Sequence, residues 1–113
     1  MGKASREKGR RGELEWKEKL QQLGFPLARR GAHGPDRVDV EHGIPGTHCE
    51  VKRTERLRLD DAMDQAEKAC GDGRVPYVAH RRNRGHWMVT ILADDLHDFA
   101  RLVYHAGALS KEA

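Results

Sequence analysis

The chain has 113 residues, which is the length of one modest domain with a single core. Hydrophobic residues make up 37% of it, charged residues 35% and aromatic residues 5%, so Leu, Val and Ala must build most of the core beneath a charged surface. No apolar run approaches the roughly 20 residues of a transmembrane helix, and the charged N-terminus lacks the apolar segment of a signal peptide. We therefore expect no membrane contact and a cytoplasmic location.

The two cysteines, Cys49 and Cys70, form no CxxC pair and show no spacing typical of a zinc site. Both are predicted to be small core residues. The net charge of +3 is concentrated in a basic arm over residues 1–11, whose basic side chains are Lys3, Arg6, Lys8, Arg10 and Arg11. Such an arm suits a polyanionic partner, and a solvated tail is equally consistent with the charge alone.

The first half of the chain predicts one helix followed by three extended segments. Trp16, Leu20 and Leu23 at helical spacing indicate a helix over residues 12–23, with Gly24 as its stop. Glu13 stands at the N-terminal end of its apolar face, where the helix dipole favours an acid. Strands are expected over 25–30, 38–41 and 47–53, and the turn residues at 43–46 predict that the last two form a hairpin.

Side chains of a strand alternate between the two faces of its sheet. Glu50 and Lys52 therefore share one face, while Cys49 and Val51 occupy the other. On the neighbouring strand, Asp39 is opposite in face to the valines that flank it. The alternation thus makes Asp39, Glu50 and Lys52 the candidates for one common site.

The second half predicts a helix, a strand pair and a last helix. An amphipathic helix is expected over 57–70 from the apolar positions Leu59, Ala62, Met63, Ala66, Ala69 and Cys70. Strands follow over 75–80 and 86–92, joined by a basic connection, and Asp94 is expected to cap the last helix, whose core stripe is Leu96, Phe99, Ala100 and Val103. The folded domain is expected to span 12–106, with 107–113 as a flexible tail.

The chain resembles the PD-(D/E)XK nuclease superfamily and, within it, the archaeal-type and phage Holliday junction resolvases. The resemblance covers residues 8–99 and is carried by Lys8-Gly9, Glu13, Gly24-Phe25, Arg37-Val38-Asp39-Val40 and Glu50-Val51-Lys52. It implies an α/β fold of restriction-endonuclease type, with a mixed central β-sheet flanked by helices in the order αβββαββα. It also implies a Mg²⁺-dependent homodimeric endodeoxyribonuclease that cuts four-way DNA junctions, with Mn²⁺ as a possible substitute metal.

The chemistry of these residues fits phosphodiester hydrolysis. Asp39 and Glu50, joined by Glu13, offer the all-oxygen ligands that Mg²⁺ prefers, and Lys52 beside them can orient or activate the attacking water. An isolated Glu-x-Lys is more often an ordinary surface pair, and the convergence of Asp39 and Glu13 favours the catalytic interpretation. A nuclease for flaps, mismatches or plain duplex, and a non-catalytic DNA-binding module of the same fold, remain the alternatives.

Two departures from the resolvase pattern concern the loop before the second strand. Asp36 follows Pro35 and spells the literal motif, but we assign the metal to Asp39 because it stands within an extended run, whereas an Asx turn explains Asp36. Many resolvases place a catalytic serine in this loop, and here His33 or Arg30 is the candidate to replace it.

His48 is predicted to border the site by alternation with Glu50, without binding the metal directly. Gln65 resembles a glutamine of related nucleases, and an ordinary polar residue at the boundary of the core is an equal alternative for it. The remaining histidines show no metal-ligand spacing and are expected on the surface or in loops. Basic residues in the connections are expected to bind DNA phosphates without reading its sequence. They are Arg29, Arg30, Arg37, Arg53, Arg56, Arg58, Arg81, Arg82 and Arg84.

Overall fold

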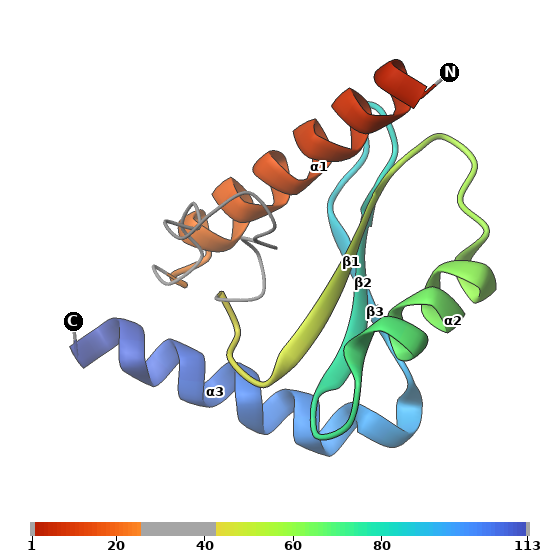
Figure 1. Cartoon of the computed structure of the whole chain (residues 1–113). Helices are drawn as coiled ribbons and strands as arrows, with labels where there is room; N and C mark the ends of the chain where they lie inside the picture. Colours follow the sequence, from red (N-terminus) through yellow and green to blue (C-terminus); the bar gives the residue numbers. More distant parts are fainter. Residues whose placement is uncertain (1, 26–42, 113) are drawn as a thin grey trace.

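The computed structural model describes residues 2–25 and 43–112, which form an α/β fold of three helices and a three-stranded mixed sheet (Figure 1). The elements in chain order are α1 (Gly2–Gln22), β1 (Thr47–Arg53), α2 (Leu59–Cys70), β2 (Val75–Arg81), β3 (Met88–Ile91) and α3 (Leu96–Glu112). None of the helices in these two ranges is long and apolar enough to cross a membrane.

The sheet has the order β1-β2-β3, so β2 lies in the middle. β1 and β2 are parallel, with Cys49 opposite Tyr77 and Lys52 opposite His80, and α2 connects them. β2 and β3 are antiparallel, which confirms the predicted strand pair of the second half. A parallel pair needs a crossover connection, and the amphipathic α2 supplies it.

Each face of the sheet has its own core. Trp16 and Leu20 of α1 and Ala106 of α3 pack with Tyr77 and Ala79 of β2 on one face. On the other face, the buried side of α2 packs on Val78. Figure 1 accordingly shows α1 and α2 on opposite sides of the sheet. The two cysteines are buried and free, as predicted.

Trp16 anchors α1 to the middle strand. Its Nε1 atom donates a hydrogen bond to the hydroxyl of Tyr77 at 3.2 Å, and the Trp87 ring lies 5.2 Å from its own. Burial of a tryptophan therefore leaves no unsatisfied donor here. The predicted apolar face is confirmed at Trp16 and Leu20 but is wrong at Leu23, which is 57% exposed beyond the end of the helix.

α1 begins at Gly2, ten residues before the predicted start at Gly12. Residues 2–11 lack apolar periodicity, but seven of the ten are Lys, Arg, Ala or Glu, which favour helix, and none is proline. Gly12 faces β1 closely, because a Cβ atom there would lie 2.9 Å from the Cβ of Arg53. The role of residues 1–11 as a DNA-binding arm stays a prediction.

The other boundaries differ in smaller ways. α2 ends at Cys70, as predicted, and is followed by Gly71 with a φ of +70°, but it begins at Leu59 and Ala69 is exposed. Asp94 lies inside a 3₁₀ turn (Ala93–Asp95) that precedes α3, so it does not cap that helix. Phe99 and Val103 pack against the core as predicted, whereas Leu96 and Ala100 are exposed. α3 also continues through Gly107 to Glu112 instead of ending there.

Several predictions lie outside the described residues. These are the strand over 38–41, nearly all of the strand over 25–30, and therefore the hairpin between 38–41 and 47–53. Six predicted site residues and cations also lie outside the described residues: Arg29, Arg30, His33, Asp36, Arg37 and Asp39.

Candidate functional site

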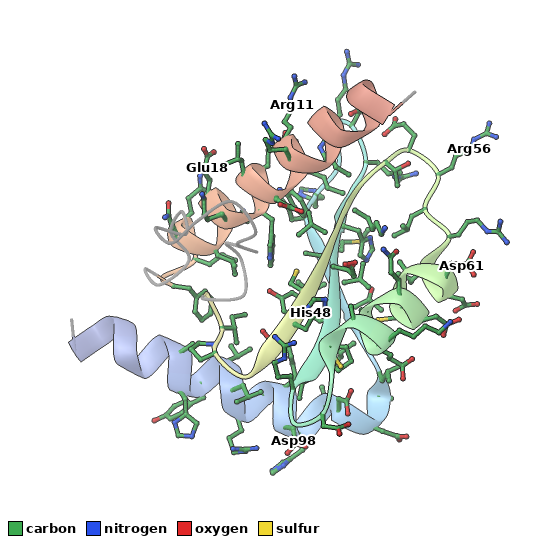
Figure 2. All side chains as sticks on the ribbon, in the orientation of Figure 1. Arg11, Glu18, His48, Arg56, Asp61 and Asp98 are labelled. Atoms are coloured by element: carbon green, nitrogen blue, oxygen red, sulfur yellow. The ribbon has the colours of Figure 1, made fainter. Side chains whose placement is uncertain are left out.

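Glu50 and Lys52 lie on the face of β1 that α2 covers. Their neighbour Cys49 is buried in the core on the opposite face, so the alternation predicted from sequence is confirmed. His48 shares the face of Glu50, as predicted, and its Nε2 atom lies 3.9 Å from the Oε1 atom of Glu50. Figure 2 shows the labelled His48 beside the sheet.

The ammonium group of Lys52 is fixed by α2. Its Nζ atom donates a hydrogen bond to the Oε1 atom of Gln65 at 2.8 Å. Gln65 therefore lies next to Lys52, and its place at a functional site stays a prediction. An amide oxygen accepts this bond without neutralising the lysine, so the positive charge of Lys52 remains available to a nearby phosphate.

Sequence reasoning missed His80, which was expected on the surface or in a loop. His80 lies in β2 directly opposite Lys52, and its Nε2 atom is 2.9 Å from the Oγ1 atom of Thr90 on β3. Burial lowers the pKa of His80 below its ordinary value of 6.5, which favours the neutral imidazole. The available signal was strand alternation, which places every second residue of 76–80 on the α2 face.

The predicted carboxylates are only partly brought together. Glu13 is exposed on α1, one residue after the glycine that faces β1, and Asp39 lies outside the described residues. Burial raises the pKa of the Cys49 thiol to about 12, and the negative charges of Glu50 and Glu13 add to this rise. Glu50 nevertheless shares the sheet face that α2 covers, whereas Glu13 belongs to α1, which packs on the opposite face.

Within residues 2–25 and 43–112 no three His, Cys, Asp or Glu side chains form a group that could hold a metal ion. The carboxylate oxygens of Glu50 and Glu13 have the donor chemistry that suits Mg²⁺. A complete ligand set would need a further oxygen donor, and Asp39 is the predicted one.

Exposed cations gather at the end of the sheet where β1 and β2 finish. Arg10 and Arg11 of α1, Arg56 of the β1–α2 connection and Arg82 and Arg84 of the β2–β3 connection are all exposed. Figure 2 shows the labelled Arg11 and Arg56 toward this end and Asp98 at the opposite end. Lys3, Arg6 and Lys8 belong to the first turns of α1. We name this region the basic end.

Arg53 and Arg81, also predicted to contact DNA, have structural partners. The Nε atom of Arg53 lies 3.0 Å and the Nη1 atom of Arg81 3.4 Å from the same carboxylate oxygen, Oε1 of Glu15 on α1. These side chains are 17% and 29% exposed. Two cations share one anion, so the cluster keeps a net positive charge at the ends of β1 and β2.

Comparisons of the chain with protein-family models, with curated proteins and with solved structures find no match.

Proposed function

We propose that the chain is a Mg²⁺-dependent, structure-specific endodeoxyribonuclease of restriction-endonuclease-like fold that hydrolyses phosphodiester bonds of branched DNA, with a four-way junction as its substrate. The observation that carries the proposal is the 2.8 Å hydrogen bond from Lys52 to Gln65, which holds an ammonium group on the same face of β1 as Glu50. The basic end lies where this strand finishes and offers the charge that a DNA backbone requires.

The residues divide the chemistry between them. Glu50, Asp39 and Glu13 would hold Mg²⁺, which when bound polarises the phosphoryl oxygen and lowers the pKa of an attacking water. Lys52 orients that water and stabilises the negative charge that develops on the phosphoryl group. Gln65 accepts the hydrogen bond of the Lys52 ammonium group and is a positioning residue.

The described topology is compatible with this fold. The strand that carries Glu50 and Lys52 is followed by a crossover helix and a parallel strand, and the sheet has helices on both faces. A four-way junction has two-fold symmetry, so paired cuts need two copies of the site, and we expect a homodimer.

Cleavage of a labelled four-way junction by the purified chain tests the proposal, with a flap and a linear duplex of the same sequence beside it. We expect the junction to be cut only when Mg²⁺ or Mn²⁺ is added. Equal cutting of flap or duplex would assign the nuclease to another DNA substrate. Binding without cutting in either metal would leave a non-catalytic DNA-binding module.

Two pairs of variants separate the site from its surroundings. Glu50→Gln should abolish cutting and retain binding, because the loss of a negative charge weakens metal capture and reduces repulsion of phosphates. Glu67→Gln, on the exposed side of α2, is the control and should cut like the wild type. Asp39→Asn should be inactive and Asp36→Asn active, and the reverse result would move the metal ligand to Asp36.

A further inference from the structure

The turn between β2 and β3 contains a strained residue. Arg84 has a φ of +61° and is the one non-glycine residue with a positive φ in the part of the chain that the structure describes. An L side chain in this conformation costs free energy that glycine would avoid. A strained residue persists when its surroundings fix it, and such residues concentrate at functional sites.

The turn over residues 82–85, which we name the hairpin tip, is closed by its own hydrogen bonds. The amide of Gly85 donates to the carbonyl of Arg82 at 2.9 Å. The Nε atom of Arg81 donates to the carbonyl of Gly85 at 2.8 Å. Both bonds hold the backbone on either side of Arg84, so the strained conformation is built into the turn.

Asn83 connects the hairpin tip to the end of β1 by two hydrogen bonds. Its backbone amide donates to the Oε2 atom of Glu55 at 2.5 Å, and its Oδ1 atom accepts a hydrogen bond from the Nη1 atom of Arg53 at 2.6 Å. Arg53 directly follows Lys52 in β1. The hairpin tip therefore has a fixed position relative to the strand that carries the candidate catalytic lysine.

The hairpin tip presents cations to solvent. Arg82 and Arg84 are exposed on either side of Asn83. Arg53 and Arg81, by contrast, form ion pairs with Glu15. A turn that is already ordered loses little conformational entropy when it binds a ligand. Exposed arginines held in this way are suited to phosphates, which accept their hydrogen bonds and neutralise their charge.

We infer that the hairpin tip is a preformed element that binds the phosphate backbone of one duplex arm of the DNA, with Arg82 and Arg84 as its contacts and Asn83 as the residue that positions them. This inference rests on the proposed function, because it takes the substrate to be DNA and adds which element holds a duplex arm. It also explains why an arginine stands where glycine would be less strained.

Duplex binding by the full chain in EDTA tests the inference, because no metal-dependent cutting takes place there. Arg84→Gly should weaken binding about three- to tenfold at moderate salt and reduce the slope of log affinity against log salt by about one. The same variant should raise the denaturation midpoint, because the strain is relieved.

Arg84→Lys should retain the salt slope. Arg101→Gln on α3 is the control and should bind like the wild type.

Asn83→Ala tests positioning, because it removes the Arg53 contact and no charge. We expect weaker binding with an unchanged salt slope, and binding equal to the wild type would remove Asn83 from the inference. Arg84→Gly with wild-type affinity and slope would overturn the inference itself. A chain that binds duplex and never cuts would overturn only the nuclease proposal, whereas a chain that cuts the junction but binds no duplex would overturn only the inference about the hairpin tip.

Discussion

The Nζ atom of Lys52 donates its hydrogen bond to Gln65 of α2, and within the described ranges it forms no ion pair with Glu50. An ordinary surface Glu-Lys pair would bring these two charges together across one strand face. The observed partner keeps the ammonium apart from the carboxylate, so both remain available to a metal and a phosphate.

Lys52→Ala should slow the chemical step by roughly 10² or more while DNA binding persists, because the lysine acts on charge that develops in the transition state. Gln65→Ala should slow it less, by about tenfold, since the ammonium remains but is no longer held. Single-turnover rates at saturating Mg²⁺ measure both effects. A Lys52→Ala variant that cuts within a few-fold of the wild type would exclude Lys52 from catalysis.

Glu15→Ala should lower the free energy of unfolding by about 1–2 kcal/mol, because it leaves the half-buried Arg53 and Arg81 without their shared anion. The control is Arg101→Ala, which breaks the exposed pair with Asp98 and should cost about 0–0.5 kcal/mol. Urea denaturation compares the two. Equal losses would show that the Glu15 cluster contributes no more than a surface pair.

Gly46→Ala should destabilise the fold more than Gly73→Ala. Both glycines have a positive φ, +91° and +84°, so both changes introduce backbone strain. Only at position 46 would the new Cβ atom also meet a side chain, the Cδ2 atom of Leu102 at 2.8 Å. Thermal denaturation gives the difference. Leu102→Ala should therefore cost less free energy of unfolding in the Gly46→Ala background than in the wild type. In the Gly73→Ala background it should cost as much as in the wild type.

The lowered pKa of His80 makes stability depend on pH. The unfolded chain binds the proton more readily, so the contribution of His80 is present above pH 6.5 and is lost as the pH falls through its folded pKa. His80→Gln should therefore lose less free energy of unfolding than the wild type between pH 7 and pH 5. Denaturation curves at several pH values test this, with the exposed His105→Gln as the control. Parallel pH profiles of His80→Gln and the wild type would contradict it.

Local periodicity accounts for what the sequence could predict about the site. The alternation of residues 48–52 places Glu50 and Lys52 on one face and Cys49 on the other, because a strand has the same two-residue period whichever strand it pairs with. The apolar spacing of α2 likewise identifies its buried side at Ala62, Met63 and Ala66.

Contacts between residues far apart in the chain account for much of what the sequence could not predict. The register that brings His80 opposite Lys52 depends on the length and docking of α2, which no local pattern encodes. The Glu15 contact with Arg81 joins residues 66 positions apart, and both residue types read as ordinary surface charges. The early start of α1 was missed for another reason, because helix propensity without an apolar stripe gives only a weak signal.

The middle position of β2 determines how the fold opens. Tyr77, Val78 and Ala79 are completely buried, and their strand is paired on both edges and packed on both faces. Fraying at the ends of α1 or α3 would leave the amides of these residues protected. Their hydrogen exchange with solvent should therefore require global unfolding and be the slowest in the described chain. Exchange rates at these three amides would then measure the stability of the whole domain, whereas amides of the hairpin tip would measure only local opening.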